Sequence, residues 1–162
     1  MASIQSMLAI GALVIFSIVS LLFNSSYMQS SAIEIEDKVY LTAFSLADDL
    51  IEEMKQKAFD EKTVDFQAIR VDQLTPDGSL HPDGSEAWPN FNDIDDYDDY
   101  NKDVDAPHAE GYHITCTVNY CDEAGNTIHT QAFYKKVTIT VASDYLRDPF
   151  EMFFVFSLHS KN

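Results

Sequence analysis

The sequence predicts an α+β fold in which a long N-terminal helix packs on a C-terminal antiparallel sheet. Three observations lead to this fold class. They are an uncharged apolar stretch from Ile4 to Phe23, helical spacing that continues to about residue 58, and strand-like alternation in the last third of the chain. We expect two parts, an apolar helix over residues 1–30 and a globular head over residues 31–162 that includes the amphipathic half of the helix.

The apolar stretch reads IQSMLAIGALVIFSIVSLLF and contains no Asp, Glu, Lys or Arg. As a helix it would be about 30 Å long, which is the thickness of the hydrocarbon core of a bilayer. The first basic residue is Lys38, so no positive segment precedes the stretch, and the run is longer than the apolar core of a secretory signal. Two interpretations stay open: an uncleaved membrane anchor, or a mature chain whose basic leader has been removed.

A single apolar stripe continues at helical spacing after the apolar stretch. Its members are Val39, Ala43, Leu46, Leu50 and Met54. No proline occurs before Pro76 and no glycine between Gly11 and Gly78, so nothing in this region is a strong helix breaker. We therefore expect one nearly continuous helix from about residue 2 to about residue 58, about 85 Å long. Its second half should cover the core of the head.

Three strands are expected in the last third. Residues 111–120 alternate apolar and polar side chains, residues 127–141 form a long second strand, and the apolar residues between 150 and 158 define the buried face of a third. Residues 122–126 are typical of a hairpin connection. Two Pro-Asp-Gly-Ser segments, at residues 76–79 and 82–85, predict turns, and the acidic residues 90–105 predict a loop.

The formal charge of −17 limits the class of partner. All charged residues come after Ile33, so the head is acidic and should be repelled by nucleic acids and anionic lipid surfaces. The histidines are scattered without the spacing of a zinc site, and no nucleophile or nucleotide-binding motif occurs. We expect neither an enzyme nor a nucleic-acid-binding protein.

The acidic residues 90–105 contain a partial calcium-loop pattern. Asp99, Asn101, Asp103 and Glu110 match positions 1, 3, 5 and 12 of such a loop, but Val104 stands where the glycine of position 6 is expected. We therefore advance a calcium site as a hypothesis, with no other cofactor. Its candidate ligands are Asp93, Asp95, Asp96, Asp98, Asp99, Asp103 and Asp105. The alternative is a solvated loop whose aspartates cap turns.

The two cysteines, Cys116 and Cys121, leave a disulfide open. A pair of cysteines in an exported domain suggests a bridge. On one continuous strand, however, they would be about 16 Å apart, whereas a disulfide needs Cα atoms within about 7 Å. A bridge therefore requires a turn or bulge between them.

This combination of features resembles the type IV pilin and pseudopilin family, with the sequence likeness carried by Met1 to Met54. The resemblance implies a ladle-shaped subunit whose apolar helices bundle in the centre of a helical filament while the heads face outward. It implies an inner-membrane pool before assembly, an ATPase-driven assembly machinery, a methylated N-terminus and a final location at the cell surface. The assembly residues implied in this chain are Met1, Ile4, Gln5, Leu8, Gly11, Leu13, Phe16 and Leu22.

One residue departs from the pattern of the family. The fifth mature position usually holds a glutamate, and here it holds Gln5, which can accept a hydrogen bond but carries no charge. The function expected from the sequence is a pilin that self-assembles into a filament. The alternatives are a pseudopilin of a type II secretion machine and a monomeric, single-pass, membrane-anchored domain that binds a ligand outside the membrane.

Overall fold

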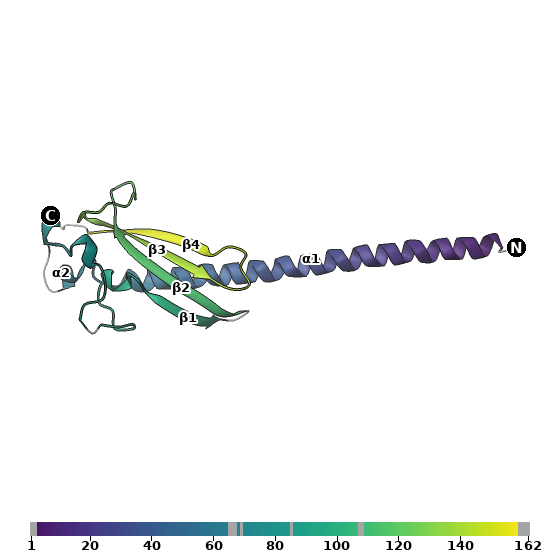
Figure 1. The fold of residues 1–162 in the computed structure, drawn as a ribbon, viewed down its shortest axis with the longest axis horizontal. Coiled ribbons are helices and arrows are strands. Elements are labelled where there is room, and N and C mark those ends of the chain that lie inside the picture. The colour runs from purple at the N-terminus through teal and green to yellow at the C-terminus, as the bar shows by residue number, and fades with distance from the viewer. Residues whose placement is uncertain (1–2, 65–67, 69, 85, 107–108, 159–162) are drawn as a thin grey trace. The chain divides into compact units, whose positions relative to one another are not determined.

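The computed structural model describes residues 3–64, 68, 70–84, 86–106 and 109–158. It confirms the expected α+β class, with a long N-terminal helix and a four-stranded antiparallel sheet (Figure 1). The chain forms two compact units, Met1–Lys38 and Val39–Asn162. The boundary between them lies beyond the expected one at residue 30, because residues 31–38 of the helix are still exposed.

The helix α1 spans Ile4–Met54, somewhat shorter than expected at both ends. At its start the backbone N–H of Ser6 donates to the carbonyl oxygen of Ser3 at 2.8 Å. After its end Lys57 continues the turn, with its N–H bonded to the carbonyl of Met54 at 3.0 Å. The Lys57 ammonium then donates to the carbonyl of Phe91 at 2.7 Å, which fixes the position of the chain where the helix stops.

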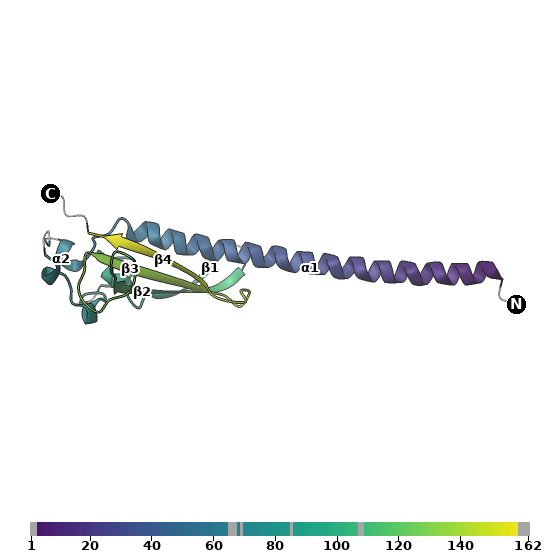
Figure 2. The ribbon, with the colours of Figure 1, turned by 90° about the horizontal axis from the view of Figure 1, so that it is seen from above.

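The second half of α1 covers one face of the sheet within the head (Figure 2). The expected stripe is confirmed, with Leu46 only partly buried. The buried helix residues are Val39, Ala43, Ala47, Leu50, Ile51 and Met54. Two of them are alanines without any exposed surface, so the backbone of the helix lies close to the sheet at that level.

The sheet has the strand order β1-β2-β3-β4 and is antiparallel throughout. Its strands are β1 (Asn101–Ala106), β2 (Ala109–Tyr120), β3 (Tyr134–Ala142) and β4 (Phe150–Ser157). The inward faces follow the expected alternation. They consist of Tyr112, Ile114, Cys116, Val118 and Tyr120 on β2, Val137, Ile139 and Val141 on β3, and Phe156 with half-buried neighbours on β4.

Two expectations about the sheet were wrong. Residues 101–105, expected in a loop, belong to the edge strand β1, in which Asp103 and Asp105 are exposed. Charged residues disfavour a strand by propensity, yet at a sheet edge they stay in water and discourage pairing with another sheet. The strand expected from Thr127 begins only at Tyr134. The Gln131 side chain donates to the carbonyl of Leu74 at 2.7 Å, so this segment is tied to another loop.

Short helices fill the connection between α1 and the sheet. They are α2 (Glu61–Val64) and the 3₁₀ turns η1 (Val71–Gln73), η2 (Asp77–Ser79) and η3 (Asp95–Tyr97). The second Pro-Asp-Gly turn has Gly84 at a φ of 62°, as expected, whereas the first closes as the 3₁₀ turn η2. Ala58 forms a bridge with Asp93, which brings the acidic segment next to the end of α1.

Candidate functional site

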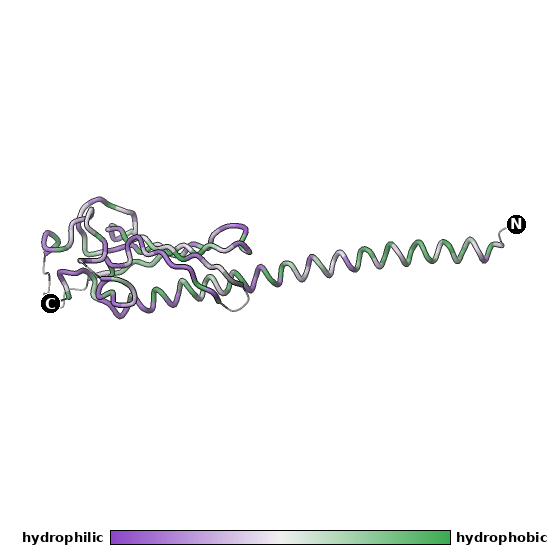
Figure 3. Tube along the Cα trace, turned by 60° about the horizontal axis from the view of Figure 1, so that its bottom comes forward, coloured by the Kyte–Doolittle hydropathy of each residue, from purple (hydrophilic) through white to green (hydrophobic). Residues whose placement is uncertain are grey.

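The first candidate site is the apolar segment, defined here as residues 4–33 of α1. It carries no charged residue, and every residue in it is exposed in the single chain. Figure 3 shows mainly green and white along this part of the helix. Successive side chains such as Val14, Ile15 and Phe16 point to different sides, so the apolar surface surrounds the helix. By length and composition the segment could cross a membrane.

The expected assembly residues lie on this segment. Ile4, Gln5, Leu8, Gly11, Leu13, Phe16 and Leu22 are all exposed on α1, whereas Met1 lies outside the described residues. A Cβ atom added at Gly11 would meet nothing within 4 Å, so the backbone there is open to a close approach. The hydroxyl of Ser17 donates to the carbonyl of Leu13 at 2.8 Å, which satisfies this polar group inside the helix.

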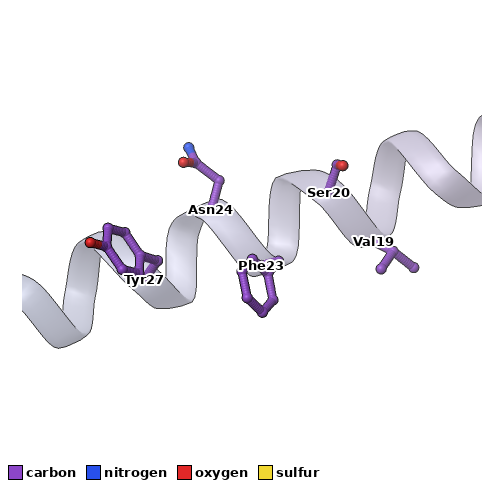
Figure 4. A pocket seen from close by; sticks show the side chains of 5 residues that line it. All are labelled: Val19, Ser20, Phe23, Asn24 and Tyr27. Atoms are coloured by element: carbon purple, nitrogen blue, oxygen red, sulfur yellow. The ribbon is translucent and has the colours of Figure 1, made fainter.

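A shallow hollow lies further along the same helix (Figure 4). Its five lining residues all belong to α1. They are Val19, Ser20, Phe23, Asn24 and Tyr27. Because one helix supplies every side chain, the hollow is open to the surroundings and belongs to the exposed surface of the apolar segment.

The second candidate site is a buried charge cluster in the head, made of Asp60, Asp93, Asp95, Asp96 and Lys135. Lys135 has no exposed surface. Its ammonium donates to Asp60 Oδ2 at 2.7 Å, to Asp95 Oδ1 at 2.5 Å and to the carbonyl of Phe59 at 2.9 Å. All three N–H bonds of the ammonium are therefore used, as a buried cation requires.

Asp60 is held from several sides. Its Oδ1 accepts from the backbone N–H of Lys62 at 3.0 Å and from the Thr75 hydroxyl at 3.0 Å, and its Oδ2 from the Tyr120 hydroxyl at 3.1 Å. Burial by itself raises the pKa of Asp60. The charge and hydrogen bond of Lys135, with backbone N–H groups, more than offset that effect and hold this pKa below its usual value.

The pKa values of two other carboxyls in the cluster, Asp93 and Asp95, shift in the opposite direction. Burial, together with the charges of Asp95 and Asp96, raises the pKa of Asp93 to about 8. Burial raises the pKa of Asp95 to about 7, although Lys135 acts in the other direction. Within the described part of the chain, Asp95 Oδ2 has no hydrogen-bond partner. One lysine thus faces more buried carboxyls than it can neutralise, so some of them hold a proton near neutral pH.

Sequence reasoning named Asp93, Asp95 and Asp96 only as candidate calcium ligands and missed Asp60 and Lys135, although one signal for the lysine was present. Lys135 has the same parity as Val137, Ile139 and Val141, so it lies on the inward face of β3. A lysine on such a face requires a buried acidic partner. Its partners Asp60 and Asp95 are 75 and 40 residues away in the sequence, so no local pattern identifies them.

Of the seven expected calcium ligands, only Asp93, Asp95 and Asp96 lie together, in the buried charge cluster. Asp93 Oδ1 accepts from the N–H of Asp95 at 2.6 Å, and Asp98 Oδ1 from the N–H of Val118 at 2.8 Å. Asp103 contacts His113 from β1. Asn101, Asp103 and Asp105 lie on one exposed face of β1, because side chains two positions apart share a face of a strand. The extended backbone separates each from the next by about 7 Å, so these side chains do not surround a single ion as those of a calcium loop do. Among the described residues, no group of three or more acidic, His or Cys side chains is arranged to hold a metal ion.

The remaining acidic residues of that hypothesis also serve local backbone structure. Asp99 has a φ of 59° at the turn into β1, and Asp105 Oδ1 accepts from the N–H of Gly111 at 3.0 Å. Cys116 lies within β2 and Cys121 directly follows its last residue, and both are buried free thiols with no bridge between them. Burial raises the pKa of both thiols, which keeps them protonated.

Comparisons of this chain with family models, with curated proteins and with solved structures gave no match.

Proposed function

We propose that this chain is a structural subunit that self-assembles through its apolar segment into a filament of the type IV pilus kind. The observation that carries the proposal is the continuity of α1. One helix of 51 residues joins the exposed apolar segment to the stripe buried in the head. A membrane anchor alone requires only about 20 residues. Because the same helix forms the apolar segment and part of the head, a bundle of the apolar segments would hold the heads on its outside.

The physical chemistry of the apolar segment supports assembly. A helix that is apolar on all sides is stable in lipid or among copies of itself. Transfer of the apolar segment from the membrane to a helix bundle therefore need not expose it to water. Packing between helices then depends on close approach at small residues. Gly11 offers an open backbone for such an approach, and the Ser17 hydroxyl is already satisfied within its own helix.

Exposed apolar side chains also occur on the part of α1 that belongs to the head. Tyr40, Leu41 and Phe44 are all exposed, between 45% and 65% of their surface. The rings of Tyr40 and Phe44 contact Phe150 of β4 edge-on, with centroids 5.2 and 6.0 Å apart. Exposed apolar groups of this kind mark surfaces that partners cover. In the proposed filament, helices of neighbouring subunits cover them.

Electron microscopy of material sheared from cells that express the chain tests the proposal. We expect fibres that contain the chain. Short assemblies that remain with the membrane would favour the pseudopilin alternative. Protein found only in detergent-solubilised membranes, without fibres, would contradict self-assembly and favour a monomeric anchored domain.

A matched pair of variants separates assembly from membrane insertion. Gly11→Leu keeps the segment apolar and therefore keeps it in the membrane, but it adds bulk where helices are proposed to approach. We expect fewer fibres at an unchanged amount of membrane-bound protein. Leu21→Ile changes shape without adding volume and should leave both unchanged. Normal fibre yield from Gly11→Leu would refute the role given to Gly11.

A further inference from the structure

The amino group of Lys135 and the carboxyl group of Asp95 lie in the arrangement that amide formation requires. The two groups are in direct contact, at 2.5 Å from Nζ to Oδ1, and almost no surface of either side chain is exposed. The rings of Phe59 and Tyr120 lie over the ammonium, with centroids 4.6 and 5.1 Å from Nζ. These rings exclude water from the contact, and water is the reagent that would reverse the reaction.

The two carboxyls that contact Lys135 differ in the chemistry they can perform. Asp60 accepts hydrogen bonds from Lys62, Thr75 and Tyr120 as well as from Lys135, which holds it as a carboxylate. A carboxylate is a poor electrophile but a suitable proton acceptor, and its Oδ2 lies 2.7 Å from Nζ. Among the described residues, Asp95 has only Lys135 on its Oδ1 and no partner on its Oδ2. In the acid form it is the electrophile.

We propose that Lys135 and Asp95 join through an intramolecular amide bond between Nζ and Cγ. Asp60 takes one proton from the ammonium, and the resulting amine attacks Cγ of the protonated Asp95. The N–C bond forms and the bond from Cγ to the departing oxygen breaks. That oxygen keeps the proton of the acid and takes the proton that Asp60 holds, so it leaves as one molecule of water. The nitrogen then gives a second proton to Asp60, which ends in the acid form. No oxidant, reductant or co-reactant is consumed.

Folding supplies the driving force for this condensation. In water, amines and carboxylic acids are separated and charged, and they do not condense. Held in contact, two reacting groups reach effective concentrations of about 10⁵ M or more, provided that their geometry is productive. The burial that raises the pKa of Asp95 to about 7 also populates the acid form that the reaction needs. The bond would tie η3 to β3 across 40 residues of sequence.

Intact-mass measurement of the full chain under denaturing conditions tests the proposal. The expected mass is lower than the sequence mass by one water, and a protease digest should contain a branched peptide that joins Asp95 to Lys135. A full sequence mass would overturn the proposal. So would a branch that ends at Asp60. A lost water found at Asp77-Gly78 or Asp83-Gly84 would also overturn it, because Asp-Gly pairs can lose water by cyclising on the backbone.

Three variants sharpen the test. Lys135→Arg removes the amine, so the mass deficit should disappear, whereas Lys136→Arg, at the neighbouring position of β3, should keep it. Asp95→Asn should still form the bond with loss of ammonia, and its product should have the same mass as the cross-linked unmodified chain. A mass deficit that persists in Lys135→Arg would refute the assignment of the nitrogen, whether or not that variant is fully stable.

Discussion

In chains whose intact mass shows no amide, replacing Lys135 by Met tests the energetic role of the buried charge cluster. The substitution keeps the volume of the side chain and removes its charge, which leaves Asp60 and Asp95 without their shared cation. Both carboxyls are at most 2% exposed, so water cannot take the place of the ammonium. Breaking a buried ion pair in this way costs about 3–5 kcal/mol. That is a large part of the roughly 5–15 kcal/mol that stabilises a typical domain.

Urea unfolding of the full chain in mild detergent, followed by the fluorescence of its single tryptophan, Trp88, measures this cost. Lys136→Met is the control, because Lys136 lies at the next position of β3 and its ammonium contacts the Phe153 ring. We expect the control to lose less than about 1 kcal/mol. Adding Asp60→Asn and Asp95→Asn to Lys135→Met should recover part of the loss, because no buried charge then stays uncompensated. Equal losses for Lys135→Met and Lys136→Met would refute the reasoning.

Three further predictions concern the head. The raised pKa of Asp93 means that the folded head keeps a proton which the unfolded chain releases near pH 4. Stability should therefore fall as the pH rises from about 4 through about 8, and Asp93→Asn should flatten a urea-midpoint profile over that range; a rising profile would contradict the assignment. Ala47→Leu should overpack the contact between α1 and the sheet and cost about 1–3 kcal/mol in thermal unfolding, whereas the exposed Leu41→Ala should cost almost nothing. Tyr120→Phe removes the hydroxyl 2.7 Å from the carbonyl of Thr75 and should cost about 1–3 kcal/mol, against little change for the exposed Tyr145→Phe; similar costs for both tyrosines would count against the buried hydrogen bond.

Local periodicity made a large part of the fold predictable. The stripe on α1 and the inward faces of β2 and β3 follow from repeats of 3.6 and 2 residues, which act over a few neighbouring positions. The edge strand β1 was missed because its residues have little strand propensity, and it pairs only because β2 lies beside it. The start of β3 was misplaced for a similar reason, since the contact of Gln131 with Leu74 lies between distant segments.

For the charged residues, too, local patterns were visible in the sequence, whereas contacts between distant residues were not. The acidic pattern near residue 99 suggested metal ligands because spacing alone cannot tell a loop from a strand. In the extended strand β1 the alternate side chains share a face but lie about 7 Å apart, so they do not surround one ion. The inward parity of Lys135 was visible in the sequence, but the identity of its partners was not. The bridge between Ala58 and Asp93 holds the acidic segment where Asp95 contacts the lysine.

The sequence by itself therefore determined the apolar segment, its continuation into the head and the inward faces of the strands, because each depends on neighbouring residues. Only the tertiary structure decided which strand closes the edge of the sheet, that the two cysteines stay apart as free thiols, and that Asp60 and Asp95 meet on Lys135. Those outcomes depend on contacts between residues far apart in the chain. The free energy of a buried charge is set by the groups that surround it in space.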